Sequence, residues 1–157
     1  MPVMRNQLTL NAQLKIVLFL ALLISIIEIV NLLLGRQLNT FGLIPRNTDA
    51  LIGIITAPFL HGSLLHYTSN IFPLCIFSFL MLQHGLVRFI FVSCFCVLVS
   101  GLLVWCFGRS AIHVGASGLI YGYLGYLLLA GWLSGKLKLL LISLFVDNLF
   151  SSKNPLY

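Results

Sequence analysis

Residues 14–34 read LKIVLFLALLISIIEIVNLLL, a nearly uninterrupted apolar run of 21 residues. A helix of that length crosses the hydrocarbon core of a bilayer, which is about 30 Å thick. A secretory signal peptide would have a shorter apolar region followed by a small-residue cleavage site, whereas Gly35-Arg36 follows here. We therefore expect a retained membrane span, preceded by a polar N-terminal segment, residues 1–13, in the cytoplasm.

Three further apolar runs have the length of membrane spans. They cover residues 66–82, which Pro73 interrupts, residues 89–107 and residues 115–133. The connection at residues 35–65 is too apolar for an ordinary hydrophilic loop, so we expect part of it to lie in the membrane interface.

The apolar pattern ends with half of a fifth span. Residues 137–150 are expected to form a partial span, because their apolar run meets Asp147 and Asn148 too early to cross a bilayer. Residues 151–157 form a polar tail. The sequence therefore predicts an all-α membrane protein whose domain covers residues 14–150, a polytopic transmembrane helix bundle with four clear spans, an incomplete fifth and no sixth.

The composition excludes two other classes of protein. Hydrophobic residues make up 60% of the 157 residues and charged residues only 8%, with a mean hydropathy of +1.08. A soluble domain carries about 25% charged residues, and disordered chains are poor in apolar residues. The chain is therefore expected to be an integral membrane protein.

The net charge of +6 does not indicate nucleic-acid binding, because the basic residues are scattered between the apolar runs. With the N-terminus inside, five basic residues fall on the inner side and three on the outer side, which favours a cytoplasmic N-terminus. The inner five are Arg5, Lys15, Arg88, Lys136 and Lys138, and the outer three are Arg36, Arg46 and Arg109. The four cysteines lie inside apolar runs without metal-ligand spacing, so we expect no metal and no cofactor.

Two clusters of polar side chains lie at the starts of expected spans. In HGSLLHYTSN, residues 61–70, His66 and Asn70 are four residues apart and share one helix face. In HVGASG, residues 113–118, Ser117 follows a glycine at a helix start, where backbone N–H groups favour a developing negative charge. On the expected topology both clusters lie at the outer face, and a serine facing His and Asn donors is a layout for acyl-transfer chemistry.

Each cluster has a plainer structural interpretation. Glycine and serine are common at helix contacts in membranes, and a single His or Asn in a span is often a structural hydrogen-bonding group. The joint presence of the two clusters, on separate spans and on the same side, favours the catalytic interpretation.

The segments HGSLLHYTSNIFPL and WCFGRSAIHVGASGLIYGYLGY resemble the rhomboid family of intramembrane serine proteases. Upstream, FGLIPRNTDALIGIITAPFLHG and Glu28-Ile-Val-Asn31 resemble it too, so that the similarity covers about residues 28–133. The resemblance implies an endopeptidase that cleaves a transmembrane protein substrate within the lipid bilayer. It implies Ser117 as the nucleophile, with His66, Asn70 and the Ser117 N–H forming the oxyanion hole.

The resemblance also assigns supporting roles. Gly115 would let the chain turn closely behind the nucleophile, and His61 would support the loop rather than take part in chemistry. Gly118 and Gly122 form a small-residue face, on which the resemblance implies that a sixth span packs and brings the general-base histidine beside the nucleophile.

That sixth span is not present, and the Trp-Arg pair common in the family's first loop is also missing. Of the histidines in the chain, His84 lies at the far end of its span, and a turn separates His113 from Ser117. If His66 acted as the base, the oxyanion site would lose a donor. The ending DNLFSSKNPLY is what a frameshift or premature stop would give, and a natural short protein is the competing account.

Two classes of function therefore remain open. One is the protease, either in a full-length relative or completed by a separate polypeptide that supplies the missing spans. The other is a non-catalytic, rhomboid-like binder of transmembrane helices, truncated or evolved as a pseudoprotease. A small helical membrane subunit without rhomboid activity is disfavoured by the two motifs.

Overall fold

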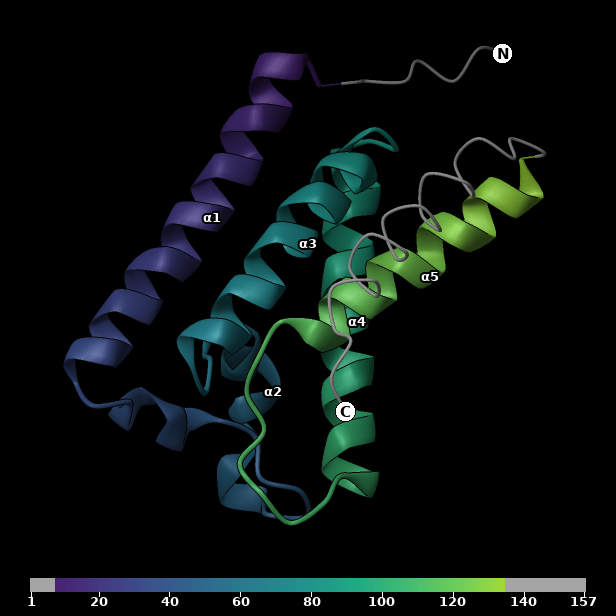
Figure 1. Cartoon of the computed structure of the whole chain (residues 1–157). Helices are drawn as coiled ribbons and strands as arrows, with labels where there is room; N and C mark the ends of the chain where they lie inside the picture. Colours follow the sequence, from purple (N-terminus) through teal and green to yellow (C-terminus); the bar gives the residue numbers. More distant parts are fainter. Residues whose placement is uncertain (1–7, 135–157) are drawn as a thin grey trace, which may run out of the picture. The chain divides into compact units, whose positions relative to one another are not determined.

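The structure, a computed structural model, describes residues 8–134, and all the longer regular elements in that range are helices (Figure 1). Five α-helices are joined by turns and three short 3-10 helices. The α-helices are α1 (Leu10–Leu33), α2 (Gly53–Thr56), α3 (Leu64–Leu82), α4 (Leu86–Phe107) and α5 (Ser117–Leu133). The 3-10 helices are η1 (Gln37–Phe41), η2 (Thr48–Ala50) and η3 (Ala57–Phe59).

Three of the described helices, α1, α3 and α4, are long and apolar enough to cross a membrane. The fourth expected span corresponds to α5, which is equally apolar but has 17 residues. The partial fifth span at 137–150 and the tail at 151–157 lie outside the described residues. The prediction of an all-α fold is confirmed for residues 8–134.

Helices α1 and α3 begin before the apolar runs that predicted them, because polar side chains cap them. The Thr9 hydroxyl accepts a hydrogen bond from the Ala12 N–H, so α1 starts four residues before the expected span and includes residues 10–13. The Ser63 hydroxyl likewise accepts from the His66 N–H at the start of α3. Ser and Thr are preferred caps because they satisfy N–H groups without an intrahelical acceptor. Pro73 does not end α3, which runs unbroken through it.

Helices α1 and α3 lie side by side (Figure 1). Polar pairs connect them near both ends. The Ser25 and Tyr67 hydroxyls are 2.6 Å apart, and Gln83 Nε2 donates to Gln13 Oε1 at 2.6 Å. In a low-dielectric surrounding such paired polar groups fix the register of two apolar helices.

The connection between α1 and α3 is folded rather than extended. Its short helices dock onto the turn between α4 and α5, where Leu43 and His113 exchange backbone hydrogen bonds of 3.0 and 2.8 Å. Arg46 Nη1 donates to the Gly108 carbonyl at 3.0 Å, and its own N–H donates to the Trp105 carbonyl. This connection, residues 34–63, is called the docking loop below.

The described residues divide into two units, with the boundary between Tyr123 and Leu124. Every contact discussed below lies within the first unit. Its fully buried side chains include Met81 and Leu82 of α3 and Tyr123 of α5, whereas large apolar side chains such as Phe19, Val87 and Phe91 point outward. An apolar exterior over an apolar core is what a lipid surrounding requires.

Candidate functional site

The first part of the candidate site is the start of α3. The cap at Ser63 sets the helical register from residue 64 onward, which places His66 and Asn70 one turn apart. Asn70 is 5% exposed, and its Nδ2 donates to the His66 carbonyl at 2.8 Å. This bond uses one of the two hydrogens on Nδ2, so the amide keeps a second donor.

The second part is the turn that leads into α5. Gly115 has a φ of +118°, a conformation that side-chain-bearing residues rarely adopt, and its N–H donates to the Ala57 carbonyl at 2.8 Å. The expected span began at Gly115, but the helix begins two residues later because this backbone conformation is not helical.

The two parts meet at His66 and Gly115. A Cβ atom placed on Gly115 would lie 2.6 Å from both Nε2 and Cε1 of His66. The imidazole therefore lies directly against the Gly115 backbone, which only a residue without a side chain allows. The structure thus brings His66 to the segment that ends at Ser117, two residues further along.

Ser117 is the first residue of α5, and its side chain is exposed. The first helical backbone bond after it is donated by the Ile120 N–H to the Ala116 carbonyl at 3.0 Å. The N–H groups of residues 117–119 precede that bond and have no acceptor one turn earlier in the helix. Such a helix start is electropositive and suits an anion.

The position of His66 favours one tautomer. The Gly62 N–H donates to His66 Nδ1 at 3.4 Å, a long bond that makes Nδ1 the acceptor. In a neutral ring the hydrogen then resides on Nε2, the atom that faces Gly115. His66 therefore presents an N–H donor toward the turn before Ser117.

His61 lies next to His66 and is 1% exposed. Its ring makes edge contacts with His66 and Tyr67, with centroid distances of 5.3 and 5.6 Å. Its carbonyl accepts from Arg36 Nη1 at 2.6 Å and from Asn39 Nδ2 at 3.2 Å. Burial, the neighbouring His66 and the Arg36 guanidinium together lower the pKa of His61 from 6.5 to about 4.

The other two histidines come from the turn before α5 and from the residues after α3. His113 Nε2 is 3.0 Å from the Arg109 carbonyl, and its backbone pairs with Leu43. His84 follows the far end of α3, 18 residues after His66. Within residues 8–134 no three His, Cys, Asp or Glu side chains gather into a group that could hold a metal ion.

Gly118 and Gly122 face α4 in the structure. The packing of a sixth span against them stays a prediction. A Cβ on Gly118 would lie 2.6 Å from the Ser100 hydroxyl oxygen, and one on Gly122 would overlap the Cys96 sulfur. The two glycines are therefore needed for the close approach of α5 and α4, and this face is not an open groove.

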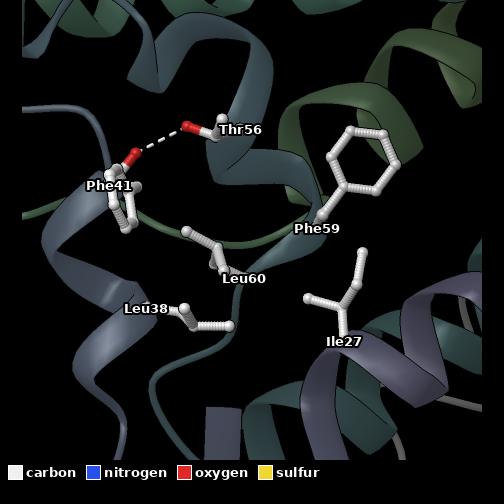
Figure 2. A pocket seen from close by; sticks show the side chains of 6 residues that line it. All are labelled: Ile27, Leu38, Phe41, Thr56, Phe59 and Leu60. Atoms are coloured by element: carbon white, nitrogen blue, oxygen red, sulfur yellow. Dashed lines mark hydrogen bonds between the residues drawn. The ribbon is translucent and has the colours of Figure 1, made fainter. Parts of the chain in front are cut away.

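Sequence reasoning missed two features beside the site. One is an ion pair between Arg36 and Glu28. The available signal was the carboxylate of Glu28 inside an apolar span. The other is an open apolar pocket of about 220 Å³, formed where α1 meets the docking loop (Figure 2). Six side chains line it: Ile27, Leu38, Phe41, Thr56, Phe59 and Leu60. No periodicity in the sequence indicates it, because its walls come from four separate elements.

Comparison with known proteins agrees with the resemblance. The chain matches the family described as Rhomboid domain over residues 48–150. It is 39% identical over 119 residues to uncharacterized proteins of Mycobacterium bovis and Mycobacterium tuberculosis, covering 72% of this chain and 49% of each relative. An uncharacterized protein of Mycobacterium leprae is 36% identical over the same length, covering 47% of that relative. No solved structure matches the chain.

The described residues form a helical membrane domain. In it, helix α5 begins at Ser117, and the His66 ring lies against the turn just before that serine. Within that class, the chain belongs to the rhomboid family. It spans about half the length of the curated relatives that it matches.

Proposed function

We propose that this chain carries the nucleophile and the oxyanion hole of a rhomboid-type intramembrane serine endopeptidase. The observation that carries the proposal is the contact of the His66 ring with Gly115, two residues before the exposed Ser117. The substrate would be a transmembrane protein, reached from the lipid bilayer near the outer face, with the N-terminus of this chain in the cytoplasm.

In the proposed reaction the Ser117 oxygen attacks the carbonyl carbon of the scissile peptide bond, and its proton passes to a general base. The negative charge on the carbonyl oxygen is met by His66 Nε2–H, the second N–H of the Asn70 amide and the backbone N–H of Ser117. Collapse of this intermediate breaks the C–N bond, and the amine leaves with the proton. Water then hydrolyses the acyl-enzyme, restoring the Ser117 hydroxyl. Each such donor is worth about 10²–10³ in rate.

The general base would come from outside this chain. His66 faces Gly115 with a donor rather than an acceptor, because the Gly62 N–H occupies Nδ1. His113 is engaged with the Arg109 carbonyl, and His61 lies behind His66. A separate polypeptide or a longer form of the protein would therefore supply the histidine, since a serine hydroxyl is a weak nucleophile without a base.

The same observation favours a second function, a non-catalytic binder of transmembrane helices. Labelling with an active-site fluorophosphonate separates the two. In the protease, the chain together with a fragment supplying the missing spans should become labelled at Ser117, and Ser117→Ala should remove the label. Full assembly of the two parts without labelling of Ser117 would favour the binder.

The substrate should unwind locally before attack, because a helix shields its carbonyls by hydrogen bonding. We therefore expect Gly or Pro near the cleavage point to speed cleavage relative to a poly-Leu span. Equal cleavage of the two would contradict this mechanism.

A further inference from the structure

A buried carboxylate of α1 faces the histidine that lies behind the candidate site. Glu28 is 3% exposed, and its Oε1 accepts from Arg36 Nη2 at 2.9 Å. Its second oxygen, Oε2, has no hydrogen-bond partner and lies 3.9 Å from His61 Nδ1. Both ring nitrogens of the buried His61 also lack a partner. Three buried polar atoms of the Glu28–Arg36–His61 cluster are thus left unpaired beside one another.

Only the Nδ1–H tautomer of His61 gives the free Glu28 oxygen a donor, and it leaves Nε2 of the ring without a partner. The titratable and charged groups facing the ring are Glu28 from α1, Arg36 from the docking loop, and His66 and Tyr67 from α3. Arg36 is a donor only, and the two aromatic rings meet His61 edge to face. The Glu28 oxygen is therefore the acceptor in reach of Nδ1, and a shift of about 1 Å would bring the pair to an ordinary hydrogen-bond length.

We propose that Glu28 is a positioning residue, which fixes His61 as the Nδ1–H tautomer so that the His61 ring holds His66 against Gly115. The importance of His66 in this inference rests on the proposed function. Glu28 touches none of the proposed reacting groups, and it acts only through His61. The lowered pKa of His61 supports the proposal, because a neutral ring has a tautomer to select.

The arrangement also explains why α1 carries a carboxylate in an apolar run. An ion pair with Arg36 alone would need only one carboxylate oxygen of Glu28, and Arg36 Nη2 donates to that oxygen. Arg36 Nη1 donates instead to the His61 carbonyl at 2.6 Å, so Arg36 holds both the carboxylate and the histidine backbone. The carboxylate is therefore aimed with its second oxygen at the ring, as in other carboxylate–histidine pairs that set a tautomer.

The substitution Glu28→Gln would exchange donor and acceptor in the proposed Glu28–His61 hydrogen bond, with almost no change in the shape of the side chain. Arg36 would keep the amide oxygen as its acceptor, which turns the amide NH2 toward His61 Nδ1. Because a donor then faces Nδ1, His61 should switch to the Nε2–H tautomer. The matched control is Asp49→Asn, the same carboxylate-to-amide change on an exposed residue of the docking loop.

The experiment is long-range 1H–15N NMR of the full 157-residue chain with 15N-labelled histidine in micelles, the four rings being assigned by single His→Gln variants. We expect His61 as Nδ1–H and His66 as Nε2–H in the unsubstituted chain. In E28Q, His61 should switch tautomer and the His66 ring signals should move, whereas D49N should change neither.

An Nε2–H tautomer of His61 in the unsubstituted chain would overturn the inference, and that measurement needs no variant to fold. A folded E28Q chain with unchanged His61 and His66 signals would overturn it as well. These outcomes are distinct from failure of the proposed function. Loss of Ser117 labelling in every assembled form would reject the protease while leaving the tautomer result standing.

Discussion

Gly115 is the residue on which the geometry of the candidate site depends most directly. Its φ of +118° and its contact with the His66 ring both exclude a side chain. We expect Gly115→Ala to destabilise the fold by about 1–3 kcal/mol through backbone strain, and to shift the His66 ring signals. Thermal unfolding in micelles and histidine NMR measure the two effects.

The matched control for that substitution is Gly62→Ala. Gly62 also borders His66, but a Cβ there would lie 4.0 Å from Nδ1, an ordinary contact. We expect G62A to have a much smaller effect on stability than G115A. Equal losses in the two variants would contradict a special role for the Gly115 conformation.

His61 makes the stability of the chain depend on pH. Its pKa is lowered to about 4 in the folded chain, so as the pH falls the unfolded chain takes up the proton first. The contribution is fully present above about pH 6.5 and is lost as the pH falls toward 4, a difference of about 3 kcal/mol. Thermal unfolding between pH 7.5 and pH 4.5 should show this loss. His61→Asn should reduce it, and His113→Asn should leave it in place.

At this scale the sequence predicted the local placement of the candidate residues on their helices and turns, but not most of their contact partners. The spacing of His66 and Asn70, and the glycine before Ser117, follow from local helix and turn chemistry. The contact of His66 with Gly115 joins segments about 50 residues apart, and the Glu28–His61 pair joins α1 to the docking loop. No periodicity encodes such long-range contacts, although the expected topology and the resemblance both placed the His66 and Ser117 clusters at the same face.

The docking loop is the element that holds the Ser117 segment in place. Arg46 donates to the Cys106 and Gly108 carbonyls at the end of α4 and to the Ser110 hydroxyl. Because Arg46 is exposed, we expect Arg46→Ala to lower stability by at most about 1 kcal/mol. Hydrogen exchange at the amides of His113 and Gly115 should nevertheless become faster, since both amides donate to the docking loop.

Arg88→Ala is the control for this prediction. Arg88 is an exposed arginine near the opposite end of α4, so its removal changes the charge equally. Hydrogen exchange followed by mass spectrometry compares the two variants. Equal acceleration of the His113 and Gly115 amides in both would contradict the role of Arg46.

The α4–α5 contact predicts a rescue by a second substitution. Gly122→Ala would place a methyl group against the Cys96 side chain, and such overpacking costs about 1–3 kcal/mol. Cys96→Ala removes the sulfur that the new methyl would meet. We therefore expect the G122A/C96A double variant to regain part of the stability that G122A loses, measured by thermal unfolding. Strictly additive losses would contradict direct packing of the two positions.

The helix boundaries show where the apolar pattern alone predicts an element and where it does not. The long runs predicted α1, α3 and α4 to within a few residues, because membrane-length apolar helices leave few alternatives. Residues 35–65 were predicted only as an apolar loop. Their short helices exist through contacts such as the Leu43–His113 pairing and the packing of Gly53 on the Leu43 backbone, which are tertiary in origin.

On the scale of the whole molecule, the question is which parts are needed for catalysis. Under the proposed function, the first unit supplies the oxyanion donors and the serine, while the rings of His61, His66 and His113 are engaged in other contacts. We therefore expect no Ser117-dependent cleavage by the 157-residue chain alone. The oxyanion donors by themselves would give turnover too slow for a typical assay, because an unactivated serine hydroxyl is a weak nucleophile.

Adding a general-base histidine on a separate fragment should give proteolytic activity if the protease proposal holds. The chain is co-reconstituted with a separately expressed fragment carrying a fifth and a sixth span with a histidine, and cleavage of a transmembrane substrate is followed. We expect cleavage that is abolished by Ser117→Ala in the chain and equally by replacing the histidine of the fragment. Cleavage by the chain alone that still requires Ser117 would contradict this division of labour. It would indicate that His66 or His113 changes its hydrogen bond to act as the base, since each now has a ring nitrogen paired with a backbone group.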